Sequence, residues 1–347
     1  MGCSVTQQAA FGFTAADVAT AVHRGRLLSM EIEFSLRCSF QCPYCYVPPE
    51  ESFERELTPE EIRDTITQAK ELGARKIIVL GGEPSIYPHL EEMIGFIRGL
   101  DLEVEMFTNG TGVTAAVARM LKTHGVRVVL KMNSFDEALQ DRLAGKKGAY
   151  RIIHEALAHL QAAGYPAADA FLAVSTVICR QNIHELPDLW QWLRDRGIVP
   201  YVEIITPQAN AIENTWLDVP PPETHQLFKT LAEIDRTKYG RDWDPQPPLV
   251  GNKCLRHQFS CLVNAHGEVM PCVGVTLSMG NIRQKPLKTI LAESAVLKDL
   301  KNYRHTIKGP CRDCEKAESC YGCRGAAFQL TGDPLASDPL CWKNYQG

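Results

Sequence analysis

The sequence contains no run of 18 apolar residues, which excludes a membrane-spanning helix of ordinary length. Its first residues, MGCSVTQQ, lack a basic segment followed by an apolar one, so no secretory signal is expected. Positive charge is not in excess, because 37 Lys and Arg stand against 41 Asp and Glu. A net charge of −4 gives no electrostatic reason to expect a nucleic-acid partner. We therefore expect a cytoplasmic globular protein that binds neither nucleic acid nor membrane.

Cysteine, in contrast, is abundant. The chain has 13 cysteines, and eleven of them fall into two groups, at residues 38–45 and 254–341. In a large chain without a secretion signal, clustered cysteines bind metal more often than they form disulfides. Both groups are therefore candidate metal centres.

Residues 30–206 alternate short apolar runs with helical patterns, which is typical of the α/β class. The predicted strands are 30–36, 76–82, 103–110, 127–134, 170–178 and 201–207. The predicted helices between them are 58–74, 90–99, 114–124, 136–163 and 184–196. Six such units predict a parallel sheet with right-handed crossovers. Six units can curl into a partial barrel of the (β/α)6 type, similar to an incomplete TIM barrel.

Four regions are expected along the 347 residues. Residues 1–29 form an N-terminal extension with a short helix over 12–24, for which Thr14 is the predicted N-cap. The partial barrel, 30–206, is followed by a proline-rich bridging region, 207–253, with one helix near 223–238. The last region, 254–342, has eight cysteines, little helix and a hairpin signal that turns at His266 and Gly267.

The first cysteine group, Cys38, Cys42 and Cys45, has the spacing C-x3-C-x2-C and follows the first predicted strand. In parallel barrels, catalytic groups lie on the loops after the strands. A structural zinc site normally has four ligands, and the nearest histidine, His89, is far along the chain. Three thiolates leave one metal position open and also suit an iron–sulfur cluster.

With Tyr44 before the third cysteine and LGGEP at 80–84, this loop resembles that of the radical S-adenosylmethionine (SAM) superfamily. The resemblance implies a 4Fe-4S cluster on Cys38, Cys42 and Cys45, with the amino and carboxylate groups of SAM on the fourth iron. It also implies one-electron cleavage of SAM to a 5′-deoxyadenosyl radical, which abstracts a hydrogen atom from the substrate. A flavodoxin or ferredoxin would serve as electron donor.

The resemblance further implies a set of SAM contacts. They are Tyr44, Gly81, Gly82, Glu83, Asn109 and Ser134. Relatives frequently carry H-D-x-x-R-G after the fourth strand, whereas this chain has QDRLAG at 140–145 and lacks the arginine at that place. Lys131 and Arg142 are the candidates to bind the SAM carboxylate instead.

The second cysteine group resembles the SPASM extension of radical SAM enzymes, which holds two auxiliary iron–sulfur clusters. Two zinc ribbons remain an alternative, because Cys-x2-Cys pairs alone do not distinguish the metals. The resemblance assigns Cys254, Cys261, Cys272 and Cys323 to the first cluster. It assigns Cys311, Cys314, Cys320 and Cys341 to the second.

Auxiliary clusters suggest electron transfer after hydrogen abstraction, with oxidation or C–C or C–S bond formation as the outcome. One branch of relatives places an acidic base directly after a cysteine of the first auxiliary cluster, but here Val273 follows Cys272. Five other residues near strand ends or cysteines are candidates for a base: Glu31, Glu33, Tyr201, Glu203 and His257. The sequence favours none of them, so the catalytic base stays unknown.

The substrate is expected to be a small metabolite or a ribosomally made peptide. The 29 residues before the first strand are too few for the leader-binding domain of many peptide-modifying relatives, so a peptide would be brought by a separate binding protein. Two other classes stay open. One is an iron–sulfur electron-transfer or scaffold protein without SAM cleavage, and the other is a zinc-binding C-terminal interaction module.

Overall fold

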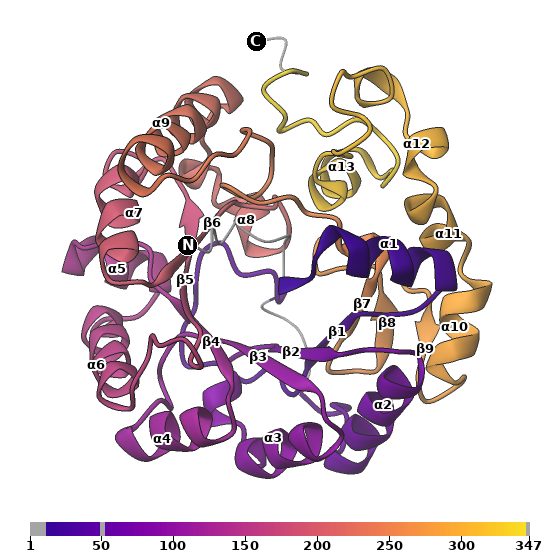
Figure 1. Cartoon of the computed structure of the whole chain (residues 1–347), viewed down its shortest axis with the longest axis horizontal. Helices are drawn as coiled ribbons and strands as arrows, with labels where there is room; N and C mark the ends of the chain where they lie inside the picture. The colour runs from indigo at the N-terminus through magenta and orange to yellow at the C-terminus, as the bar shows by residue number, and fades with distance from the viewer. Residues whose placement is uncertain (1–11, 49–52, 345–347) are drawn as a thin grey trace, which may run out of the picture.

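The computed structural model describes residues 12–48 and 53–344, so the first eleven residues of the predicted N-terminal extension lie outside it. A nine-stranded sheet runs through the molecule in the order β6-β5-β4-β3-β2-β1-β7-β8-β9. The first six strands are parallel, which confirms the partial barrel (Figure 1). They are β1 Ser29–Glu33, β2 Lys76–Leu80, β3 Glu103–Thr108, β4 Arg127–Lys131, β5 Leu172–Ile178 and β6 Val199–Ile204.

Helices lie outside these strands (Figure 1). They are α2 Pro59–Glu71, α3 Leu90–Gly99, α4 Ala115–Thr123, α5 Glu137–Ala144, α6 Ala149–Ala162 and α7 Leu186–Asp195. Helix α2 shows why they form: Thr58 and Glu61 make a capping box, and Ile62, Ile66 and Ala69 are fully buried on one face. The periodic apolar stripe thus docks each helix on the sheet.

The single helix predicted over 136–163 is wrong. The structure has α5 and α6 instead, separated by a turn in which Gly145 has a φ of 60° and Gly148 a φ of 82°. Both residues adopt the left-handed conformation that ends a helix and that glycine tolerates best. This break places the end of α5, at Ala144, against Gln41 of the first cysteine loop.

Strand β1 has two different faces. Met30 and Ile32 are fully buried in the main apolar core under the helices. Glu31 and Glu33 point the other way and line pockets inside the barrel. Because side chains alternate along a strand, this register gives the barrel a polar interior and an apolar outer layer.

The C-terminal region continues the same sheet. Strand β7 Ser260–Val263 pairs in parallel with β1, and β8 Glu268–Met270 and β9 Gly280–Asn281 follow in antiparallel order. The predicted hairpin at His266 and Gly267 is confirmed. The expectation of little helix is wrong, because four short helices follow. They are α10 Leu287–Glu293, α11 Ala295–Lys301, α12 Tyr303–Thr306 and α13 Arg324–Thr331.

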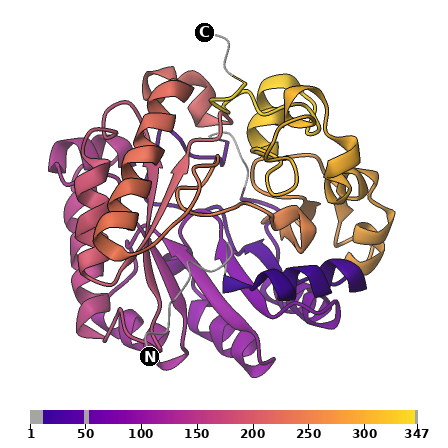
Figure 2. The ribbon, with the colours of Figure 1, turned by 45° about the horizontal axis from the view of Figure 1, so that its top comes forward.

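Three helices of the described residues lie outside the barrel repeat and the C-terminal region. Helix α1 Ala15–Arg24 begins after its predicted cap Thr14 and lies beside the C-terminal region (Figure 2), where Phe13 packs on Phe259. In the bridging region, α8 Asn210–Glu213 precedes α9 Pro221–Tyr239, which packs on α7. The buried Asp235 of α9 makes an ion pair of 2.8 Å with Arg194. No helix in the described part of the chain is long and apolar enough to cross a membrane.

Candidate active site

The loop carrying the first three cysteines packs tightly on the end of β2. The amide of Gly82 donates to the carbonyl of Ser35 at 2.8 Å, and that of Glu83 donates to the carbonyl of Arg37 at 2.8 Å. A Cβ atom on Gly82 would lie 2.3 Å from the carbonyl oxygens of Leu36 and Arg37. The glycine pair is therefore required by the backbone of the cysteine loop itself, in addition to any ligand.

The opposite side of the loop is held by α5 and α8. The amide of Gln41 donates to the carbonyl of Ala144 at 3.0 Å, and a Cβ on Gly145 would lie 2.0 Å from the carbonyl of Gln41. The side-chain amide of Asn210 donates to the carbonyl of Cys42 at 3.1 Å. Contacts from β2, α5 and α8 thus fix the backbone that carries the three thiols.

All three thiols line one pocket of about 270 Å³ inside the barrel, where β1 to β6 end. Predicted SAM contacts in the same wall are Tyr44, Gly81, Gly82 and Asn109. The side-chain amide of Asn109 donates to the sulfur of Cys38 at 3.4 Å. Burial raises the pKa of Cys38 to about 11 and of Cys42 to about 12. Buried thiols of this kind become thiolates when iron supplies the compensating charge, so the donor set fits an iron–sulfur cluster.

Two predicted SAM contacts lie elsewhere. The carboxylate of Glu83 accepts hydrogen bonds from Ser85, Thr108 and Asn109, and it ties the ends of β2 and β3 together. Ser134 is fully buried, and its hydroxyl accepts from the amide of Asp136. Neither side chain lines the pocket, so both act on the shape of the neighbouring loops.

Lys131 and Arg142, the two candidates to bind the SAM carboxylate, lie in different places. Lys131 lines the pocket with its Nζ 5.0 Å from the ring centre of Tyr44 and 3.4 Å from the hydroxyl of Ser175. Arg142 instead stacks on Trp216, 4.2 Å from the ring centre, outside the pocket lining. Of these two candidates, Lys131 is the one that lines the pocket.

Further charged groups face the pocket from β1, β6 and the C-terminal region. Glu31 and Arg256 form an ion pair of 2.5 Å. Glu203 also lines the pocket, and burial raises the pKa of its carboxyl despite the attraction of Lys131. Within the described residues its carboxylate makes no hydrogen bond or ion pair. Sequence reasoning included Glu203 among five residues without a signal to prefer it, because only the assembled pocket shows that it is unpartnered.

A second pocket, of about 570 Å³, adjoins the first, since Tyr46, Gln208 and Val273 line both. Its wall combines β1, α8 and the C-terminal hairpin, and includes Glu33 and His266. The two pockets together form a chamber between the barrel and the C-terminal region that is large enough for a cofactor and part of a substrate.

The cysteines of the second group fall into two sets. Burial is the main cause of the raised pKa of Cys320, and the nearby thiols of Cys311 and Cys314 raise it further. Burial likewise raises the pKa of Cys341, and the thiols of Cys311 and Cys320 add to that rise. These four thiols are therefore neighbours.

The other set surrounds Cys323, whose pKa is raised by burial, then by Asp338, and further by Cys254 and Cys272. The two cysteines of the CYGC segment, Cys320 and Cys323, thus belong to different sets, as the resemblance implies. Cys261 is not part of either set, because it lies in the apolar core opposite Met30.

Several buried polar atoms near Cys254 and Cys323 lack partners in the described structure. They are the Tyr321 hydroxyl, both ring nitrogens of His257, and Nε and Nη2 of Arg324. Such groups are costly unless something accepts or donates a hydrogen bond, and the sulfides of a cluster are acceptors. Within residues 12–48 and 53–344, no three His, Cys, Asp or Glu side chains converge on a single-ion site. Each cysteine of a cluster binds a different iron, so a cluster does not require such convergence.

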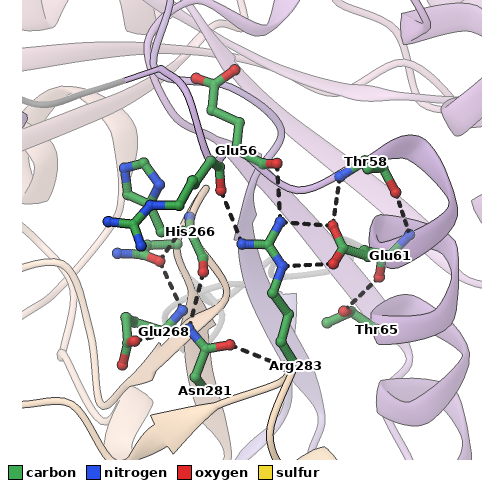
Figure 3. A network of polar contacts seen from close by, with 10 residues as sticks. Glu56, Thr58, Glu61, Thr65, His266, Glu268, Asn281 and Arg283 are labelled. Carbon is green, nitrogen blue, oxygen red and sulfur yellow. Dashed lines mark hydrogen bonds and ion pairs between the residues drawn. The ribbon is translucent and has the colours of Figure 1, made fainter.

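Arg283, which follows β9, contacts α2 and the segment that precedes it (Figure 3). Arg283 binds Glu61 of α2 through two nitrogens, at 2.6 and 2.8 Å, and donates to the carbonyls of Arg55 and Glu56. The carboxylate of Glu56 accepts from the amide of Leu36 at 2.7 Å. One chain of contacts thus connects the two cysteine-bearing regions.

Comparison with known protein families agrees with this arrangement. Residues 32–193 match the model of the radical SAM superfamily, and residues 254–315 match that of the SPASM iron–sulfur cluster-binding domain. The chain is 32% identical to a PqqA peptide cyclase of Streptomyces rochei, over 91% of this chain and 90% of the relative. It is 25% identical to an AdoMet-dependent heme synthase of Methanosarcina barkeri, over 91% of this chain and 96% of the relative.

The protein therefore belongs to the radical SAM superfamily and carries a SPASM domain. It is an enzyme whose cofactors are SAM and 4Fe-4S clusters, and the iron–sulfur match replaces the zinc alternative. The fold also matches that of SuiB from Streptococcus suis bound to S-adenosylmethionine, with a TM-score of 0.70 at 16% identity, over 93% of this chain and 80% of that chain. The AdoMet-bound structure of anSMEcpe gives 0.69 at 14% identity, over 92% and 91%.

Proposed function

We propose that the enzyme cleaves SAM reductively and abstracts a hydrogen atom from a substrate held in the chamber between the barrel and the SPASM domain. The observation that carries this proposal is the shared pocket of Cys38, Cys42 and Cys45 with Gly81, Gly82 and Asn109. When bound there, the cluster supplies the electron that splits SAM into methionine and a 5′-deoxyadenosyl radical. The scaffold alternative without SAM cleavage leaves this set of pocket residues unexplained.

The residues of the pocket would then hold SAM in one orientation. The carbonyl groups at Gly81 and Gly82 can accept from the SAM amino group, and Lys131 can bind its carboxylate. Tyr44 offers a buried aromatic face, fixed by a hydrogen bond of 2.6 Å between its hydroxyl and Asn133. The adenine of SAM is proposed to lie near this ring.

The two SPASM clusters are proposed to pass electrons to or from the substrate after hydrogen abstraction. Cys311, Cys314, Cys320 and Cys341 are the proposed ligands of one cluster. The other includes Cys254, Cys272 and Cys323; the resemblance assigns Cys261 as its fourth thiol, but Cys261 lies in the apolar core. Arg256 and Val273 line the chamber, and Arg256 lies next to Cys254 and Cys272. This closeness of chamber and thiols supports short-range electron transfer.

Glu203 is the proposed proton acceptor for the oxidised substrate. It lines the first pocket, where, unlike Glu31, it makes no hydrogen bond or ion pair within the described residues, and burial raises the pKa of its carboxyl. A base with a raised pKa can bind a proton at neutral pH more readily than an ordinary carboxylate. Loss of one electron to a cluster and one proton to Glu203 would convert a substrate radical into an oxidised product or a new bond.

For the substrate, we propose a ribosomally made peptide in preference to a small metabolite. A relative at 32% identity is named for a peptide, and SuiB was solved with its precursor peptide SuiA. The adjoining pocket of about 570 Å³ offers room for a peptide segment beside the reactive site. A separate peptide-binding protein and a flavodoxin or ferredoxin are the proposed partners.

The test is an anaerobic reaction of reconstituted protein with SAM and dithionite, analysed for 5′-deoxyadenosine. The wild type is expected to form it, and Cys42→Ala is expected to form none. Intact SAM in the presence of an assembled cluster would support the scaffold alternative. Precursor peptides from neighbouring genes, added next, should lose the mass of two hydrogen atoms, either by desaturation or by formation of a cross-link.

A further inference from the structure

Cys261 is placed where it cannot join the other cysteines of its proposed cluster. It pairs with Met30 across β7 and β1, is 1% exposed, and packs in the apolar core. Its neighbour Leu262 faces the opposite side of the sheet and lines the second pocket. Turning Cys261 toward the interior would need a one-residue slip of β7, which would also reverse Leu262 and Val263. The register of β7 therefore removes Cys261 from the ligand set.

His257 shares its neighbours with the three remaining thiols. Its ring centre is 5.6 Å from that of Tyr321, whose hydroxyl lies beside Cys254. Burial lowers the pKa of His257, and the charges of Arg256 and Arg324 lower it further, so both guanidinium groups lie near the imidazole. Arg256 also interacts with Cys254 and Cys272, and Arg324 directly follows Cys323 in the chain.

The imidazole of His257 has no partner of its own. It is 2% exposed, and neither Nδ1 nor Nε2 makes a hydrogen bond in the described structure. A buried histidine with two unsatisfied nitrogens is unfavourable unless a ligand or ion binds it. Neutral imidazole is an established ligand type for iron in iron–sulfur centres.

We propose that His257 completes the cluster of Cys254, Cys272 and Cys323, and that Cys261 is a core residue without a metal role. This inference rests on the proposed function only in that it requires an auxiliary cluster in this region. Replacing a thiolate by a neutral imidazole makes the cluster less negative, which raises its reduction potential. Such a cluster would accept an electron from a substrate radical more readily than one with four thiolates.

Pulsed EPR of the reduced wild-type enzyme, with and without ¹⁵N-labelled histidine, tests the ligand directly. A strong hyperfine coupling that changes with the label is expected from one auxiliary cluster. Full auxiliary-cluster signals without histidine coupling would overturn the proposal. That outcome is distinct from failure of the proposed function, in which SAM would stay intact whatever the auxiliary ligands are.

Variants give an independent measurement. Cys261→Ala should keep the wild-type content of about twelve irons per chain, as should the control Cys179→Ala, which removes another buried core cysteine. Cys272→Ala should lose up to about four irons. His257→Cys should retain the iron, lose the nitrogen coupling and show a lower reduction potential. Equal iron loss in Cys261→Ala and Cys272→Ala would contradict the assignment.

Discussion

Arg256 of the SPASM domain donates to Glu31 of the first barrel strand at 2.5 Å, inside the chamber that both domains line. The contact connects residues 225 positions apart in the chain. Cys254 and Cys272 act electrostatically on Arg256, so the same guanidinium also lies close to the proposed cluster of Cys254, Cys272 and Cys323. The positive charge of Arg256 therefore faces both the proposed substrate site and the proposed auxiliary cluster.

Arg256→Gln should lower the reduction potential of the first auxiliary cluster by on the order of tens of millivolts, because a nearby positive charge stabilises the reduced form. Redox titration followed by EPR measures this shift. The matched control is Arg283→Gln, which removes an arginine–glutamate pair that lines neither pocket of the chamber. Equal potentials in wild type and Arg256→Gln would contradict a role of this charge.

Gly82→Ala should destabilise the protein by about 2–4 kcal/mol, because the new Cβ would collide with two carbonyl groups of the cysteine loop. Denaturant unfolding of the protein without iron gives the free energy directly. Gly99→Ala is the control, since a Cβ there meets nothing within 4 Å. That helix position should gain or lose less than about 1 kcal/mol. Unchanged stability in Gly82→Ala would show that the loop does not pack as described.

Glu203→Gln should stabilise the fold at pH 8 while abolishing product formation. Burial raises the folded-state pKa of this carboxyl above 4.5, so the ionised group destabilises the native state at any pH above that pKa. As the pH falls toward 4.5 and below, the carboxyl is protonated in both states, and the advantage of glutamine should disappear. Denaturation midpoints at pH 8 and pH 5 provide the measurement. A stability difference that grows as the pH falls would contradict this sign.

Cys38→Ala should remove one cluster and leave the two SPASM clusters in place. Iron should fall from about twelve to about eight atoms per chain, and 5′-deoxyadenosine formation should stop. Iron analysis with EPR at cryogenic temperature distinguishes this outcome from general misfolding, in which all cluster signals would fall together. A wild-type content near four irons would contradict the presence of auxiliary clusters.

The order of strands and helices could be predicted from the sequence because it depends on local signals. Periodicity defined α2, and the capping box of Thr58 and Glu61 fixed its start. The helix break at Gly145 was missed, since glycine alone does not reveal that the carbonyl of Gln41 lies where a Cβ would be. That reason is a contact between segments far apart in the chain.

At the site, too, local sequence signals were sufficient for some residues, whereas others depend on contacts between distant segments. The spacing of Cys38, Cys42 and Cys45 pointed to the pocket because three residues of one loop must lie close together. The carboxylate of Glu83 turns toward Thr108 and Asn109, which no motif indicates. The place of Cys261 depends on how β7 pairs with β1, and spacing between cysteines carries no information on that register.

The most direct test of the central claim is the binding of SAM at the iron held by the first cysteine loop. Pulsed ENDOR of the reduced protein with SAM labelled with ¹⁵N at its amino group should show coupling between that nitrogen and the cluster. The same sample should yield 5′-deoxyadenosine on warming, and Cys38→Ala should show neither. An assembled cluster on Cys38, Cys42 and Cys45 that shows no coupling to labelled SAM and leaves SAM uncleaved would contradict the account.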